Sequence, residues 1–260
     1  MINRVKPQNL YGCWTLFRKE VWRFLKVFVQ TVLAPTVSTL LYLLVFGVVF
    51  EEAVVVYEGH SYSSFLIPGL VMMALAQNAF ANGSSSILQS KMNGNIIFVL
   101  LAPLSSFEFY IAFVAAAILR GLVVGIGVMA VAALLVDVEI YSVALILLFA
   151  TLSSGVMGAM GVIAGIWSDK YDHLSAFQNF IILPLTFLSG VFYSIQDLPP
   201  FWQQISAYNP VFYMIDGFRY GFLGVSDVSH IQSMVVAFMF FTALSLLSIG
   251  MLRSGYKLRG

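Results

Sequence analysis

Charge is scarce in this sequence. Only 10% of its 260 residues are Asp, Glu, Lys or Arg, and 60% are hydrophobic, whereas soluble domains carry about 25% charged residues. So few charges cannot cover a water-facing surface, so we expect lipid to be the main solvent of the chain. The net charge of +1 argues against a nucleic-acid partner. The single cysteine, Cys13, excludes an intrachain disulfide framework, and we expect it to be a small core or interface side chain.

Several catalytic motifs are also missing. No GxxxxGK[ST] phosphate loop occurs, so we expect that the chain does not hydrolyse ATP itself. No HExxH motif and no Cys/His cluster has metal-ligand spacing, and His60, His173 and His230 fall in expected loops. We therefore predict no catalytic residue, no bound metal and no cofactor on this chain. An intramembrane protease or transferase is disfavoured.

Long hydrophobic runs, in contrast, are abundant. Crossing about 30 Å of hydrocarbon takes roughly 20 helical residues, and backbone groups in lipid must be satisfied internally, so such runs should be helices. The sequence therefore predicts an all-α polytopic membrane protein with six transmembrane helices: 28–50, 64–88, 109–136, 142–167, 174–194 and 231–252. Residues 28–252 would form the membrane domain, after an interface segment, 1–27, and before a cytoplasmic tail, 253–260.

The basic residues favour one side of this topology. Six crossings place eleven of them on one side: Arg4, Lys6, Arg18, Lys19, Arg23, Lys26, Lys91, Lys170, Arg253, Lys257 and Arg259. The opposite loops hold one basic residue, Arg219, and many acidic ones: Glu51, Glu52, Glu58, Asp137, Glu139, Asp197, Asp216 and Asp227. This bias predicts a multi-pass membrane protein with both termini in the cytoplasm.

The N-terminal segment has the pattern of an amphipathic helix. Apolar residues recur at spacings of four and three, which places them on one helix face: Leu10, Trp14, Phe17, Val21, Phe24 and Phe28. The basic residues lie largely off this stripe. We expect a helix in the cytoplasmic interface, with its basic side chains toward anionic lipid head groups. A cytoplasmic helix packed on a soluble partner is the alternative.

The stretch 195–226 is too interrupted for a single crossing. Pro199, Pro200 and Pro210 break it, and its aromatic residues, such as Trp202, suit the head-group level of a membrane. We expect two short re-entrant helices that dip into the outer leaflet before the last span.

Charged residues are rare inside the spans. Arg120 is the one charge within a predicted span, and such a charge is a functional candidate by default. It can snorkel or pair with Glu108 or a partner chain in a structural role, or it can lie on the substrate path. The absence of a midplane carboxylate suggests that any transport draws its energy from outside the chain.

Between the last two predicted spans, Asp216 and Arg219 lie three residues apart and can pair on one helix face.

Glycines recur one turn apart in two spans, at Gly121 and Gly125 and at Gly158, Gly161 and Gly165. This spacing allows helices to approach closely. It fits tight packing within one bundle, or alternatively a dimer interface or moving gate.

A series of motifs in chain order then resembles a known family. The motifs are Phe65-Leu-Ile-Pro-Gly-Leu70, Leu101-Ala-Pro-Leu104, Leu183-Pro-Leu-Thr-Phe-Leu-Ser-Gly-Val-Phe-Tyr-Ser194, Asp197-Leu-Pro-Pro-Phe-Trp202, Tyr208-Asn-Pro210 and Asp216-Gly-Phe-Arg-Tyr-Gly-Phe-Leu-Gly224. Over nearly the whole chain, this order resembles the type-2 ABC exporter permeases, and within them the YadH-like inner-membrane permeases. Pro184 would bend its helix and free backbone carbonyls. Pro184 and Gly190, with Arg120, are therefore candidates for a gate or for packing.

The resemblance implies a permease of the bacterial inner membrane that works as a homodimer or heterodimer of six-helix subunits, of which we expect the homodimer. The dimer would be docked on cytoplasmic ABC ATPase subunits that bind ATP and Mg. It also implies an ATPase-coupling helix near 89–106, where the candidate residues are Lys91, Asn95, Phe98, Leu101 and Pro103. The re-entrant region it implies contains Pro199, Trp202, Asn209, Pro210, Asp216, Arg219 and Gly224. The chain departs from the family at 95–101, which is apolar where relatives usually carry acidic or polar residues.

The predicted function is therefore the membrane-spanning subunit of an ABC exporter, which moves a substrate outward with a separate ATPase. Substrates of the family include polysaccharides, lipid-linked glycans, drugs and peptides, and the weakly charged spans favour an amphiphilic or apolar-surfaced cargo. The alternatives are a non-transporting membrane scaffold and, third, a gradient-driven secondary carrier.

Overall fold

The computed structural model describes residues 9–47, 49, 57 and 59–258. Arg4, Lys6, Glu51, Glu52, Glu58 and Arg259, which entered the charge argument, lie outside the described residues. The described part of the chain is helical and contains no strand. Its elements are α1 (Leu10–Leu25), α2 (Phe28–Tyr42), the π-helical turn η1 (Leu43–Gly47), α4 (Tyr62–Met92), α5 (Ile96–Leu101), α6 (Ser106–Ala132), α7 (Val143–Trp167), α8 (Tyr171–Phe177), the π-helical turn η2 (Gln178–Ile182), α9 (Leu183–Phe187), the 3-10 turn η3 (Ile195–Asp197), α10 (Pro200–Ala207), α11 (Pro210–Leu223) and α12 (His230–Ser254).

Within these residues, five helices are long and apolar enough to cross a membrane. They are Phe28–Gly47, α4, α6, α7 and α12, and they match five of the predicted spans to within a few residues. The prediction of an all-α polytopic membrane protein is thereby confirmed.

The fifth predicted span, 174–194, has a different form. Here α8, η2 and α9 follow one another directly, and the helical turns end at Phe187. A π-helical turn precedes Pro184, and Gly190 adopts a left-handed φ of 73° in the turn that follows. The segment is thus broken into short pieces, and the count of six crossings stays a prediction.

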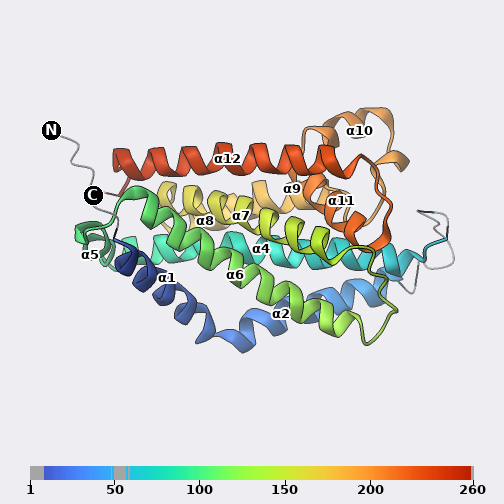
Figure 1. The fold of residues 1–260 in the computed structure, drawn as a ribbon, viewed down its shortest axis with the longest axis horizontal. Coiled ribbons are helices and arrows are strands. Elements are labelled where there is room, and N and C mark those ends of the chain that lie inside the picture. Colours follow the sequence, from blue (N-terminus) through green and yellow to red (C-terminus); the bar gives the residue numbers. More distant parts are fainter. Residues whose placement is uncertain (1–8, 48, 50–56, 58, 259–260) are drawn as a thin grey trace.

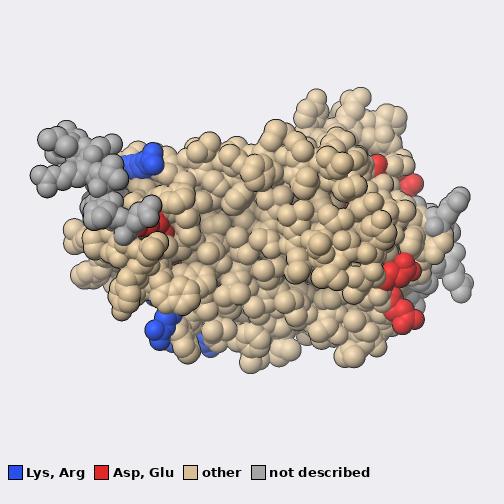
Figure 2. All heavy atoms as spheres, viewed as in Figure 1, with Lys and Arg blue, Asp and Glu red and all other residues tan. Residues whose placement is uncertain are grey.

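The long helices lie roughly along one axis of the molecule, with α4 in the middle of the bundle (Figure 1). The start of α1, α5 and the end of α12 share one end, whereas α10 and α11 lie at the other. The Lys and Arg side chains visible in Figure 2 gather at the first end, and most visible acidic side chains gather at the second. This polarity agrees with the charge bias in the sequence; which end faces the cytoplasm stays a prediction.

Glycines allow α4 and α7 to pack closely, and these two helices share the most extensive interface of the bundle. A Cβ added to Gly165 would lie 2.8 Å from the backbone oxygen of Ser84, and one added to Gly161 would collide with the backbone oxygen of Phe80. Gly121 and Gly158 face other helices of the same bundle in the same way. Packing within one bundle, the first of the two expected roles, is confirmed for these glycines.

Two spans remain open to the outside. Only 22% of the most apolar window of the first span and 17% of that of α12 are buried, compared with 78% for α4. Apolar side chains such as Leu33, Leu41 and Phe238 point outward. Such faces suit contact with lipid or with another protein.

Candidate functional site

Helix α1 packs its middle and end on the bundle. Asn9 caps it, since its Oδ1 accepts a hydrogen bond of 2.8 Å from the backbone N–H of Gly12. Phe24, from the predicted stripe, is buried, whereas Trp14 is 60% exposed; Phe17 and Val21 are half-buried. The stripe therefore meets protein at one end and points outward at the other. Its location in the membrane interface stays a prediction.

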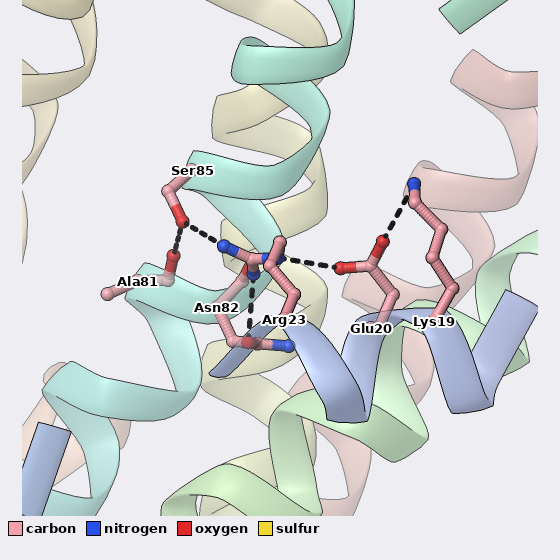
Figure 3. Close-up of polar contacts among 6 residues, drawn as sticks. All are labelled: Lys19, Glu20, Arg23, Ala81, Asn82 and Ser85. Carbon is pink, nitrogen blue, oxygen red and sulfur yellow. Dashed lines mark hydrogen bonds and ion pairs between the residues drawn. The ribbon is translucent and has the colours of Figure 1, made fainter. Parts of the chain in front are cut away.

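An ion pair is buried beneath α1, and sequence reasoning missed it (Figure 3). Glu20 is completely buried, and its carboxylate lies 3.1 Å from Arg23 and 3.2 Å from the half-exposed Lys19. The Arg23 guanidinium then reaches α4, where it donates to the backbone oxygen of Asn82 at 2.8 Å and to Ser85 Oγ at 3.3 Å. These contacts connect α1 directly to the central helix.

A signal for this pair was available in the sequence. Glu20 lies four residues after Leu16 and four before Phe24, so it shares the helix face of two buried apolar residues. A carboxylate on such a face requires a buried partner.

The Arg120 guanidinium turns toward α4. Its Nη2 donates a hydrogen bond of 3.1 Å to Oδ1 of Asn78. Of the alternatives for Arg120, pairing with Glu108 does not occur, because Glu108 closes the capping box of α6 with Ser105 and accepts a hydrogen bond from the Asn9 backbone N–H. The Arg120 Nε is buried and has no hydrogen-bond partner among the described residues.

Arg120 and Asn78 line a groove of about 430 Å³ between α2, α4 and α6. Its polar lining consists of Gln30, Thr31, Ser38, Thr39, Tyr42, Gln77, Asn78 and Arg120. An apolar groove of about 810 Å³ adjoins it at the bend between α1 and α2, and the two share Val27, Gln30 and Ala34. The sequence signal that we missed is the set of uncharged polar residues on one face of the first span, such as Thr31 and Thr39, which are eight residues apart.

The predicted coupling segment forms the short helix α5 at the end of the bundle where the visible basic residues gather (Figures 1 and 2). Phe98 is 73% exposed and Leu101 is 75% exposed. Asn95 and Pro103 are also exposed. Helix α5 therefore presents an apolar surface to the outside of the molecule.

Lys91, the remaining residue of the predicted coupling segment, points inward. Its Nζ donates to the backbone oxygens of Ile166 and Ser168 at 2.8 and 2.6 Å, and lies 3.2 Å from the carboxylate of Asp169. Lys91 thus satisfies orphan carbonyls at the C-terminal end of α7.

Two short helices, α10 and α11, occupy the predicted re-entrant region. Pro199 precedes α10, on which Trp202 is 43% exposed. Asn209 caps α11, which starts at Pro210: its Oδ1 accepts from Val211 N at 3.0 Å and its Nδ2 donates to the Leu185 oxygen at 2.6 Å. Helix α11 ends at Gly224, which has a left-handed φ of 70°. That these helices re-enter a membrane stays a prediction.

Asp216 and Arg219 do not form an ion pair with each other in the described structure. The Asp216 carboxylate accepts a hydrogen bond of 2.7 Å from the Asp227 N–H. The buried Arg219 donates to the Gly190 oxygen at 2.6 Å and lies 3.7 Å above the ring of Phe65. The expected pair is replaced because neighbouring segments offer each group its own partner. Both residues hold α11 in place.

Comparison with known proteins decides the family. Residues 11–223 match the family described as ABC-2 type transporter. The chain belongs to the ABC-2 type transporter family. It is 36% identical over 245 residues to the inner membrane transport permease YadH of Escherichia coli (strain K12). The aligned residues cover 94% of this chain and 96% of that protein. It is 26% identical over 215 residues to nodulation protein J of Rhizobium leguminosarum bv. viciae, covering 80% and 81% of the two chains.

As an ABC-2 inner-membrane permease, the chain is the membrane subunit of an ABC transporter. The features above divide this permease into three regions along its axis. The exposed helix α5 and the ion pair of α1 lie toward one end, and the polar groove lies beside the middle of α4. Helix α11, which Asp216 and Arg219 hold in place, lies at the other end.

Proposed function

We propose that this permease exports a substrate outward across the inner membrane and that a separate cytoplasmic ABC ATPase drives it. The observation that carries the proposal is the exposed apolar surface of α5, with Phe98 and Leu101 three-quarters exposed at the end of the bundle where the visible basic residues lie. An apolar helix at the cytoplasmic end suits a cleft on a soluble partner better than it suits water.

The path of the coupling follows from the contacts. ATP-driven closure of the ATPases would move α5 and α1. Because Arg23 joins α1 to Asn82, that movement would reach α4, whose residues Gln77 and Asn78 line the polar groove. Export would result from the opening and closing of this groove.

A second copy of the permease is part of the proposal. Polar side chains that line an open groove in a span are costly to leave in contact with lipid. The exposed apolar residues Leu33 and Val37 of α2 line the groove that adjoins it. A homodimer that covers this side would convert the groove into an enclosed path.

The test uses the tagged permease purified from its native membranes in mild detergent, with the ATPase that accompanies it. Phe98→Glu and Leu101→Glu should abolish permease-dependent ATP turnover, because a charge on α5 cannot dock in an apolar cleft. Tyr208→Glu, a charge placed on an equally exposed aromatic at the opposite end, should leave turnover unchanged.

The two alternatives give different results. A scaffold would bind its partner without moving cargo, and turnover would survive the α5 substitutions. A secondary carrier would take up substrate from an ion gradient without any ATPase. Within the described spans, the one acidic residue is Glu108, which is engaged in a helix cap, so the carrier has little support.

A further inference from the structure

Arg120 carries a positive charge that the described residues do not neutralise. It lies near the middle of the 27-residue helix α6, and its hydrogen bond goes to a neutral amide, that of Asn78. No acidic side chain of the described residues forms an ion pair with it. Arg120 is half-buried within a predicted membrane span, where a charge without an anionic partner is costly.

A second copy of the chain is a poor source for that partner. In the described spans the one acid is Glu108, which is committed to Ser105 and Asn9. Glu20 of α1 is already paired with Arg23. The remaining described acids lie between the spans, in loops or on the short helices. The counter-ion at the depth of Arg120 therefore has to come from a bound molecule.

The groove offers unused hydrogen-bond donors beside this charge. Both Nε of Arg120 and Nε2 of Gln77 are buried and lack an acceptor among the described residues. Both residues line the polar groove. Unpaired donors next to a guanidinium are complementary to an anion that has several acceptor oxygens, such as a phosphate or carboxylate group.

The adjoining groove determines what such an anion is attached to. It is lined mainly by apolar residues of the bend between α1 and α2, including Phe28, Leu33 and Val37, and it connects to the polar groove at Val27 and Ala34. A molecule that fills both spaces has a charged group at one end and a hydrocarbon part at the other.

We propose that the cargo of this permease is an anionic amphiphile, whose phosphate or carboxylate binds Arg120 and Gln77 while its apolar part occupies the groove beside Phe28 and Leu33. Asn78 is a positioning residue, because it holds the guanidinium without taking part of its charge. The identity of this ligand as cargo rests on the proposed function; the anion site itself does not.

The experiment measures binding to the full chain in phosphatidylcholine nanodiscs, without ATPase. The probe is dodecyl phosphate with a photoreactive diazirine in its tail, and the chain-matched neutral probe is dodecanol with the same tail. Cross-linking is mapped by mass spectrometry, and unlabelled dodecyl phosphate competes. We expect saturable cross-linking of α2 by the phosphate probe, and at least about tenfold weaker binding in Arg120→Gln, since a charge-assisted hydrogen bond is lost.

Two further variants keep the result interpretable if Arg120→Gln misfolds. Asn78→Asp leaves the guanidinium in place and gives it an internal counter-ion. Binding of the phosphate probe should therefore weaken to a similar extent, whereas binding of the dodecanol probe should not change. Arg253→Gln removes one positive charge from an exposed site at the end of α12, and should behave as the wild type.

Unchanged phosphate binding in both Arg120→Gln and Asn78→Asp would overturn the site. Loss of probe binding when phosphatidylglycerol is added to the nanodisc would also overturn the proposal, since the occupant would then be a bilayer lipid. Persistence of ATP turnover in the α5 variants together with Arg120-dependent cross-linking would refute the exporter function while the anion site stands.

Discussion

Arg23 of α1 donates two hydrogen bonds to Asn82 of α4, one to its backbone oxygen at 2.8 Å and one to its side-chain Oδ1 at 3.0 Å. The same guanidinium neutralises Glu20, which has no exposed surface. One side chain thus compensates a buried charge and joins the N-terminal helix to the centre of the bundle (Figure 3).

Arg23→Met should destabilise the permease strongly, by about 3–5 kcal/mol, because it leaves Glu20 buried without its main partner. The measurement is the unfolding midpoint in a denaturing-detergent titration. Lys19→Met is the matched control, since Lys19 is half-exposed and contributes about 0–1 kcal/mol. The double variant Glu20→Gln/Arg23→Met should regain part of the loss. Equal effects of Arg23→Met and Lys19→Met would contradict this account.

Gly161→Ala should separate α4 from α7, because the added methyl collides with the backbone oxygen of Phe80. Overpacking of this kind costs about 1–3 kcal/mol, and the same unfolding titration measures it. Gly250→Ala on α12 is the control, because nothing lies within 4 Å of its added Cβ. This variant should unfold like the wild type or be more stable by up to about 1 kcal/mol, since Ala has a higher helix propensity than Gly. A neutral Gly161→Ala would mean that the helices are free to move apart.

The spans were predictable from the sequence because hydropathy depends on length and composition, and five of them appear with nearly the expected bounds. The breaks within 174–194 were not predictable in this way. A π-helical turn such as η2 changes the backbone hydrogen-bond register without changing hydropathy. The glycine spacing predicted close packing correctly, since a missing side chain is visible in any sequence.

Charged partners were the weakest part of the sequence reasoning. Local spacing suggested that Asp216 pairs with Arg219, yet Asp216 binds the N–H of Asp227, in the loop after α11, and Arg219 binds the oxygen of Gly190, in the turn after α9. Lys91 is a similar case, since it binds carbonyls at the end of α7. Glu20 differs, because its partner Arg23 lies three residues later on the same helix. Tertiary contacts decide the partners of Asp216, Arg219 and Lys91, and the periodicity of one helix carries no information about them.

Arg219→Met should destabilise the packing of α11, because the carbonyl oxygens of Gly190 and Phe65 lose their donor. An unsatisfied buried acceptor costs about 1–3 kcal/mol. Phe65→Leu removes the ring under the guanidinium and should cost less, of the order of 0.5–2 kcal/mol for the cation–π contact. Phe201→Leu, at an exposed aromatic of the same end, should have no effect. Thermal unfolding of the purified permease ranks the three variants. An Arg219→Met variant as stable as Phe201→Leu would show that Arg219 does not hold α11 in place.

Asp169 should make a small part of the folding stability dependent on pH. Its carboxylate lies 2.8 Å from Lys257 and 3.2 Å from Lys91, so it joins the C-terminal segment to the end of α4. The hydrogen bond from Lys257 lowers the pKa of Asp169 below its usual value of 3.8. A lowered pKa in the folded state stabilises the protein at pH values above 3.8, and that contribution disappears as the pH falls through the lower, folded value.

Asp169→Asn should therefore lower the unfolding midpoint at pH 7 and converge with the wild type as the pH drops below about 3.8, the usual carboxyl value. The difference will be small because the carboxylate is 48% exposed. Asp172→Asn removes a nearby acid that forms no ion pair in the described structure, so its curve should follow the wild type throughout. A gap between Asp169→Asn and wild type that persists in acid cannot arise from the carboxylate charge, because both proteins are then neutral at that position.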